Sequence, residues 1–147
     1  DADEATYPLH VILRTDLERA MLAGDLAIND LPGAWNDGMQ RLLGITPADD
    51  KDGCMQDIHW FEGMYGYFPT YATGAMMASQ LKYNCPSYDQ FIISPNVNNM
   101  EGVSQWLIDN VHQFGSELST SEILNKISNE DLNPNYLVKH LKERFKV

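Results

Sequence analysis

The chain has 147 residues and a net charge of −11, and 44% of its residues are hydrophobic while 21% are charged. This composition predicts one globular domain with its own core rather than a disordered chain. The negative charge argues against general nucleic-acid binding, because a phosphate backbone is held by a basic surface, and it disfavours docking on anionic lipid.

The cysteine pattern and the lack of a long apolar run bear on location. Cys54 and Cys85 form neither a CxxC pair nor a zinc-finger spacing, which favours reduced thiols in a cytoplasmic protein. No apolar run approaches the roughly 20 residues of a membrane span, and no signal peptide is recognised. Because the chain starts at Asp1 without a methionine, we expect a fragment or a processed product.

Two amphipathic helices are expected in the first third of the chain. Apolar residues recur at three- and four-residue spacing over residues 9–21, and Gly24 is a plausible stop. Pro8 means that this helix either bends there or begins nearby. Asp30-Leu31-Pro32 predicts the start of a second helix, which runs to Gly44.

Helical periodicity also dominates the second half of the chain. It predicts helices over residues 71–83, 88–93 and 103–114, a helix opened by a capping box of Ser119 and Glu122, and a last helix opened by Asn133-Pro134. An asparagine-rich loop is expected over 94–99, and Leu137, Leu141 and Phe145 are expected to face inward. With no strand-like alternation, the fold class is all-α, a multi-helix orthogonal bundle.

Residues 53–71 carry an unusual density of functional side chains. An amide, a carboxylate, an imidazole, an indole and several phenols share this short stretch, which several glycines interrupt. Glycine permits backbone angles closed to other residues, so we expect an irregular loop that carries His59 and Trp60, followed by a helix that begins near Pro69. Such loops on a helical scaffold are typical of binding and catalytic sites.

Imidazole and phenol groups in this loop are candidate hydrogen-bond donors to an oxyanion. His59, Tyr67 and Tyr71 supply them, and one preorganised donor lowers a barrier by roughly 3–4 kcal/mol. If residues 56–60 are extended, Asp57 projects to the same side as His59 and fixes the tautomer of its imidazole. A well-packed aromatic corner with a hydrogen-bonded histidine explains the same residues equally well.

The histidines of this chain do not form a zinc site by themselves. None of them has a second histidine four residues away, and H-E-x-x-H is absent; they are His10, His59, His112 and His140. Neither a G-x-S-x-G turn nor a glycine-rich phosphate loop occurs. Cys54 lies five residues from His59, but a small buried thiol is the better interpretation. We therefore expect no metal ligand in this chain.

The loop also carries a recognisable motif. Its residues follow the spacing G-x-x-Q-D-x-H-W at every fixed position, with Gly53, Gln56, Asp57, His59 and Trp60. Residues 66–71 continue the likeness, and Ala2 and Asp3 match the tail of a second motif, I-R-x-x-A-D. The chain thus resembles the Taq-type thermostable metallocarboxypeptidases, a family of all-helical zinc enzymes that release single residues from peptide C-termini.

The resemblance implies that this chain is only the C-terminal part of such an enzyme. The family's zinc ligands and general base lie in H-E-x-x-H and a later segment, both upstream of I-R-x-x-A-D, and this chain has neither. Zinc is therefore expected in the full-length parent and not in residues 1–147, which we expect to be inactive alone. The expected partners are peptide C-termini, the missing N-terminal portion and a second copy in a homodimer.

The resemblance also assigns roles to residues of the loop. His59 and Tyr67 would donate to the substrate or its tetrahedral intermediate, with Tyr71 a weaker candidate, while Gln56 and Asp57 would support the loop. Which donor meets the oxyanion and which meets the substrate carboxylate stays open.

Asp3 enters through the second motif. The arginine of I-R-x-x-A-D would lie four residues before Asp3 on the same helical face, where the two could pair, and this arginine would hold the peptide carboxylate. A different class of function, a non-catalytic helical interaction or scaffold module, is the alternative, because the metal motif is missing and the apolar helices equally suit a partner.

Overall fold

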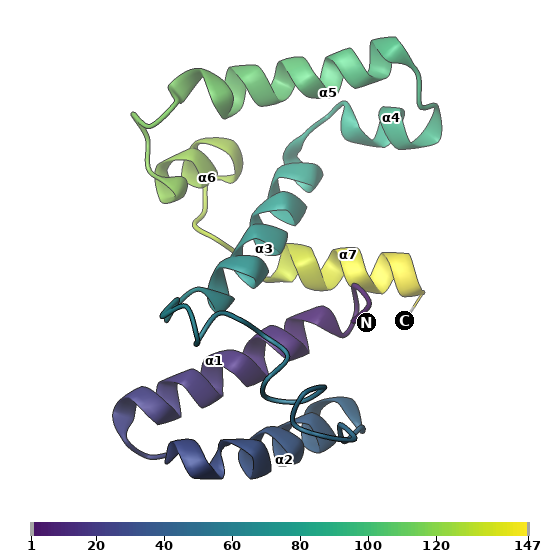
Figure 1. Cartoon of the computed structure of the whole chain (residues 1–147). Helices are drawn as coiled ribbons and strands as arrows, with labels where there is room; N and C mark the ends of the chain where they lie inside the picture. The colour runs from purple at the N-terminus through teal and green to yellow at the C-terminus, as the bar shows by residue number, and fades with distance from the viewer. Residues whose placement is uncertain (1, 147) are drawn as a thin grey trace. The chain divides into compact units, whose positions relative to one another are not determined.

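The computed structural model describes residues 2–146, and every regular element among them is helical. The order is α1 (Tyr7–Ala23), η1 (Ile28–Asp30), α2 (Leu31–Leu43), α3 (Phe68–Asn84), α4 (Tyr88–Ile93), α5 (Val97–Asn110), η2 (His112–Phe114), α6 (Thr120–Ser128) and α7 (Asn135–Phe145) (Figure 1). The all-α prediction is confirmed. The chain forms two compact units, Asp1–Thr73 and Gly74–Val147, and the single domain expected from its length stays a prediction.

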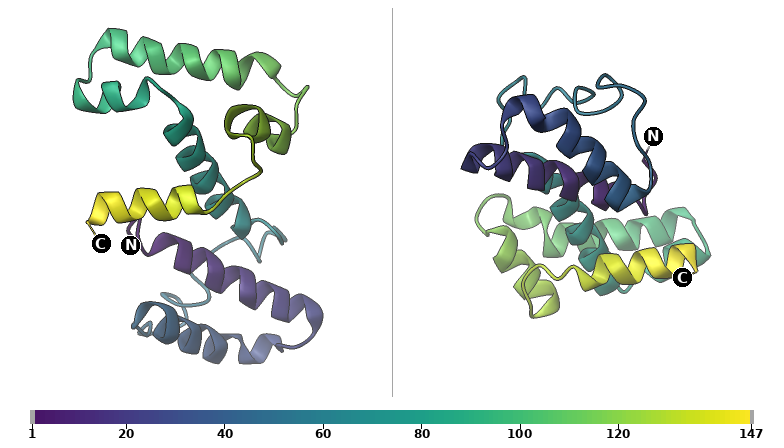
Figure 2. Two further views of the ribbon diagram at one scale, coloured as in Figure 1. Left: turned by 180° about the vertical axis from the view of Figure 1, so that it is seen from behind. Right: turned by 90° about the horizontal axis from the view of Figure 1, so that it is seen from below.

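In the first unit, α1 and α2 lie side by side (Figures 1 and 2). Pro8 sits in the first turn of α1, where its missing N–H costs no intrahelical bond, so it begins the helix and does not bend it. Gly24 and Gly44 end the two helices in the left-handed conformation, with φ of 80° and 71°. Both ends are where the sequence predicts them.

The second unit is held at its centre by Gln80, a fully buried side chain of α3. Its Nε2 donates to the hydroxyl of Ser128 at 2.7 Å and to the carbonyl of Asp131 at 3.1 Å, and its Oε1 accepts from the backbone N–H of Asn133 at 3.0 Å. Because a buried amide is costly unless hydrogen-bonded, these contacts fix α3 against the connection between α6 and α7.

Helix ends in the second unit follow local capping chemistry. The capping box of Ser119 and Glu122 at α6 is present, as predicted. The expected loop over 94–99 is too long, because the Asn96 side chain accepts from the backbone N–H of Asn99 and α5 begins at Val97. Figure 2 shows α4 lying beside this helix.

Two further expectations for the second unit need correction. The helix predicted over 103–114 ends at Asn110, and a separate 3-10 turn follows it. Of the residues expected to face inward on α7, Leu137 is buried, whereas the side chain of Phe145 is 43% exposed. The apolar side of α7 therefore extends beyond the part of the helix that the second unit buries.

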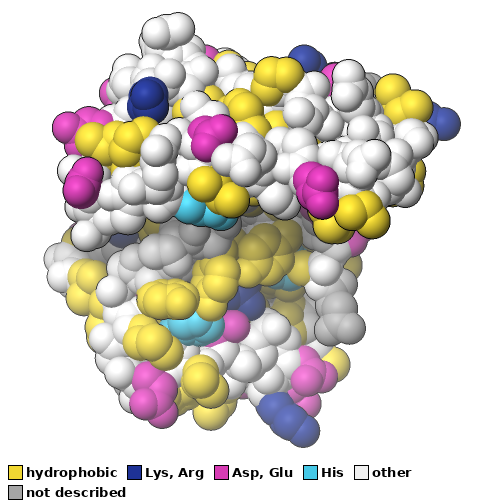
Figure 3. Space-filling view, turned by 90° about the horizontal axis from the view of Figure 1, so that it is seen from above, with side chains coloured by type: hydrophobic (Ala, Val, Ile, Leu, Met, Phe, Trp, Pro, Cys, Tyr) yellow, Lys and Arg dark blue, Asp and Glu magenta, His cyan; other side chains and the backbone are white. Residues whose placement is uncertain are grey.

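The surface mixes acidic and apolar side chains. Figure 3 shows both kinds spread over one face of the molecule. Exposed apolar side chains gather where α4 gives way to α5, with Ile93 83% exposed and Val97 71% exposed. Across residues 2–146, no helix is both long and apolar enough to cross a membrane.

Candidate functional site

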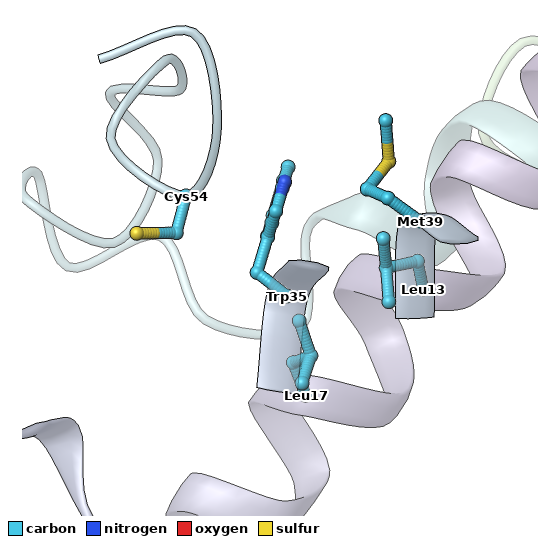
Figure 4. Packing of buried hydrophobic residues seen from close by; sticks show 5 residues of the cluster. All are labelled: Leu13, Leu17, Trp35, Met39 and Cys54. Atoms are coloured by element: carbon cyan, nitrogen blue, oxygen red, sulfur yellow. The ribbon is translucent and has the colours of Figure 1, made fainter. Parts of the chain in front are cut away.

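A small core in the first unit supports the loop that carries the predicted site. Leu13 and Leu17 of α1 meet Trp35 and Met39 of α2, and Cys54 joins them from the loop (Figure 4). Trp35 is fully buried, and burying a side chain of this kind contributes roughly 1.5–3 kcal/mol. Cys54 is 5% exposed, and burial raises the pKa of its thiol, so it behaves as a packing residue.

The loop itself is a series of turns between α2 and α3. The amide of Gln56 donates to the carbonyls of Asp52 and Gly53, at 3.2 and 3.1 Å, and so closes one of these turns. Helix α3 begins at Phe68, with Pro69 in its first turn. The prediction of an irregular loop followed by a helix near Pro69 is confirmed.

The three predicted donors come together at the end of this loop. Nε2 of His59 lies 3.1 Å from the hydroxyl of Tyr71. The ring centroids of His59 and Tyr67 are 5.5 Å apart, and those of Tyr67 and Tyr71 are 5.4 Å apart. Phe68 packs 4.5 Å from the His59 ring. The imidazole and both phenols therefore share one aromatic cluster.

Asp57 does not orient His59, contrary to the expectation from an extended loop. Its Oδ2 accepts from Nε of Arg14 at 2.6 Å. Nδ1 of His59 is buried without a hydrogen-bond partner among the described residues. The physical reason is that residues 56–60 turn and do not extend, so the carboxylate reaches a guanidinium on α1.

An open cavity of about 720 Å³ lies in the first unit next to this cluster. Gln56, Asp57, His59 and Tyr71 line it, together with residues of α1 and α2. Tyr67 is not among the lining residues, although its ring contacts two that are, and it is 44% exposed. Most of the predicted side chains thus line this one cavity.

Asp3 is not among the residues that line the cavity, although its neighbours Ala2 and Thr6 are. Its Oδ1 accepts from the backbone N–H and the hydroxyl of Thr6, at 2.8 and 2.9 Å, and these bonds hold the pKa of Asp3 below its usual value. Asp3 precedes α1 and forms part of the turn that leads into it, so its own contacts are local.

Two pKa shifts affect the cavity wall. Burial lowers the pKa of His10, with the Arg14 charge adding to the effect, so this imidazole is neutral over a wider pH range than usual. Burial and the neighbouring Tyr67 raise the pKa of Tyr71, so its phenol keeps its proton to a higher pH than an ordinary tyrosine does. His10 lines the cavity and was not predicted as a site residue.

Sequence reasoning also missed two charged residues beneath the loop. Arg14 is 7% exposed and Glu18 is 4% exposed, both on α1. The carboxylate of Glu18 accepts from Nε1–H of Trp60 at 2.9 Å and from the backbone N–H of Gly66. The sequence does carry a signal for both residues, because each is a charged residue at a position that belongs to the apolar, inward-facing side of α1.

No metal centre is formed by these side chains. Across residues 2–146, no three histidine, cysteine, aspartate or glutamate side chains converge in a way that could hold a metal ion. The cavity of the first unit is lined by aromatic, amide, imidazole, carboxylate and guanidinium groups, but three possible metal ligands among the described residues do not converge there.

Residues 1–145 match the model of the family described as carboxypeptidase Taq (M32) metallopeptidase. The chain belongs to this family. Carboxypeptidase 1 of Bacillus subtilis and thermostable carboxypeptidase 1 of Pyrococcus furiosus are each 38% identical to it, in alignments that cover 99% of this chain and 29% of the relative. The chain thus spans about 29% of the length of the curated relatives that it matches.

Solved structures of carboxypeptidases share this helical fold. The structure of Pyrococcus furiosus carboxypeptidase superposes with a TM-score of 0.89 at 38% identity, covering 98% of this chain and 29% of that one. Metallocarboxypeptidase 1 of Trypanosoma cruzi gives a TM-score of 0.84, also at 38% identity, over 100% of this chain and 31% of that one. The fold of this carboxypeptidase Taq family member is therefore that of part of a larger helical peptidase.

Proposed function

We propose that this chain is the C-terminal, substrate-cleft portion of a metallocarboxypeptidase that releases single residues from peptide C-termini. The observation that supports this most is the cavity of the first unit, which Gln56, His59 and Tyr71 line, in a chain that matches the family over residues 1–145. Family membership favours this function over the scaffold alternative.

The proposed roles follow from the chemistry and the placement of the donors. An imidazole N–H and a phenol O–H both donate hydrogen bonds, so they stabilise charge that develops on a substrate oxygen. His59 would supply the first through Nε2, which would exchange its contact with the Tyr71 hydroxyl for the substrate oxygen, and Tyr67, exposed beside it, would supply the second. Before the substrate binds, Tyr71 would orient His59 through that hydroxyl. Gln56 would hold the turn that precedes them.

Other parts of the parent enzyme complete the proposal. The ligands of its metal, which we take to be zinc, would lie outside this chain, because the described residues fit no metal. Asp3 would pair there with the arginine that the second motif implies. From the resemblance we further propose that the parent is a homodimer, and from the cysteine pattern of this chain that it is cytoplasmic.

The test is the product pattern of the full-length protein that contains this chain. An N-terminally blocked peptide is incubated with it, and the products are followed by mass spectrometry. We expect a ladder of single-residue losses from the free C-terminus, no loss from the C-terminally amidated peptide, and no turnover by residues 1–147 alone. Internal cleavage, or no cleavage of any peptide, would contradict the proposal, and the latter would favour the scaffold alternative.

A further inference from the structure

Arg14 and Glu18 lie one turn apart on α1, and both are buried in the first unit. At this spacing an arginine and a glutamate lie on one face of a helix. Apart from one bond from Arg14 to the carbonyl of His10 on the same helix, the hydrogen bonds of their charged groups go to the loop between α2 and α3. One helix thus presents a buried donor group and a buried acceptor group to the same loop.

Arg14 binds the first part of the loop. Its Nε donates to Asp57 at 2.6 Å, and its Nη1 donates to the carbonyl of His10 at 3.1 Å. The guanidinium carbon lies 4.7 Å from the ring centroid of Trp35 and 5.8 Å from that of Phe68. This stacking restricts the guanidinium to one plane, so that it fixes the direction as well as the position of Asp57.

Glu18 binds the second part of the loop. One carboxylate oxygen accepts from the indole N–H of Trp60 at 2.9 Å, and the other accepts from the backbone N–H of Gly66. The Trp60 ring also packs edge-on against Trp35 and Phe68, with centroids 6.3 and 5.6 Å away. Both oxygens of this carboxylate are therefore committed to the loop.

Stability alone gives a poor account of these charges. Taking a carboxylate or a guanidinium out of water costs several kcal/mol, and replacing buried ionic groups with apolar residues of similar volume is often neutral or stabilising. Buried charges at these two positions are thus better explained by the directional bonds that they make. Those bonds end at Asp57, Trp60 and Gly66.

We infer that Arg14 and Glu18 are positioning residues, which hold residues 57–66 on α1 and thereby set the places of His59 and Tyr67. His59 lies between Asp57 and Trp60 in the chain, and Tyr67 directly follows Gly66. Fixing these neighbours leaves the two proposed donors little freedom. The catalytic consequence rests on the proposed function, whereas the positioning itself does not.

The structural arm of the test uses NMR spectra of the 147-residue chain. Glu18→Gln replaces one acceptor oxygen with an NH2 group that faces a donor, so the resonances of the Trp60 indole and the Gly66 amide should shift. The ring protons of His59 should shift with them, because Phe68 and Tyr67 lie 4.5 and 5.5 Å away and their ring currents report small displacements. Asp16→Asn, at an exposed position of the same helix, is the matched control and should leave all three unchanged.

The kinetic arm uses the full-length enzyme at a temperature where each variant is folded. Misplacing a group by about 1 Å costs up to roughly 100-fold in rate, so we expect Glu18→Gln and Arg14→Lys to lower kcat by about 10- to 100-fold. For Glu18→Gln, KM should change by less than about threefold, since Glu18 does not line the cavity, whereas Arg14 does. Asp16→Asn and the exposed Arg19→Lys should behave like wild type, and Glu18→Asp should recover part of the loss.

The outcomes separate the two ideas. If the His59 resonances stay in place when Glu18 is changed, or if kcat is unchanged in both variants, the positioning inference is wrong. If Glu18→Gln fails to fold, Arg14→Lys decides between the same outcomes. If the wild-type enzyme releases no C-terminal residue, the proposed function fails, and the NMR arm still decides the positioning inference.

Discussion

Gln80 is a single polar residue on which much of the second unit depends. Three hydrogen bonds of its fully buried side chain reach Ser128, Asp131 and Asn133. Gln80→Ala removes these bonds and leaves the N–H of Asn133 without this acceptor, so it should lower the free energy of unfolding by about 1–3 kcal/mol. Urea denaturation measures this. Gln90→Ala, at an exposed position of α4, is the control, and an equal effect of both substitutions would contradict the interpretation.

At the scale of single residues, the sequence reveals candidates but not their partners. His59 and Tyr71 are recognisable from their chemistry and their motif. The structure places Nε2 of His59 3.1 Å from the hydroxyl of Tyr71. The partner of Asp57 is a different matter, because Arg14 lies 43 positions away in the chain. No local pattern predicts which of several nearby polar groups such a carboxylate meets. Only its position on the inward face of α1 marks Arg14 as unusual.

Among the elements, α6 depends most visibly on its cap. The hydroxyl of Ser119 accepts from the backbone N–H of Glu122, and the Glu122 carboxylate accepts from the backbone N–H of Ser119. Ser119→Ala removes half of this box and should cost about 1 kcal/mol, measured by urea denaturation. Ser121 lies two residues further along the chain and is exposed, so Ser121→Ala should change the free energy of unfolding by no more than about 0.5 kcal/mol. A larger loss for Ser121→Ala would mean that the cap contributes little.

Helix limits were predictable where a local signal sets them. Glycines in the left-handed conformation end α1 and α2, and the capping box opens α6, each a property of a few adjacent residues. The start of α5 was missed because Asn96 reads equally well as a loop residue and as a cap. The expectation that Phe145 faces inward was wrong, because periodicity shows which side of a helix is apolar but not how much of that side is buried.

For the molecule as a whole, the pH dependence of stability tests the contacts of Glu130 in the second unit. Tyr136 and Asn133 donate to Glu130, and these bonds hold the pKa of Glu130 below its usual 4.5. A lowered pKa in the folded state means that the bonds stabilise the fold above about pH 4.5, and that this contribution disappears as the pH falls through the folded-state pKa. Glu130→Gln should therefore be less stable than wild type at pH 7, and the difference should shrink below about pH 4.5.

Urea midpoints of both proteins between pH 3 and pH 7 measure this difference. Comparing the two proteins at each pH cancels the repulsion within a chain of net charge −11, which changes with pH in both. If the difference between the urea midpoints does not change with pH, the charge of Glu130 does not contribute to stability. The effect of the substitution would then come from altered packing.

We propose that the loop between α2 and α3 faces the end of a peptide, and replacing His59 by alanine in the full-length enzyme tests this proposal. Losing one preorganised donor should lower kcat by about 100- to 1,000-fold, while the free energy of unfolding changes by less than about 1.5 kcal/mol. His112→Ala, at an exposed histidine of η2, should leave both quantities unchanged. If the His59→Ala enzyme keeps the wild-type kcat, the loop does not face the substrate as proposed. The same conclusion follows if its activity falls only in proportion to its folded fraction.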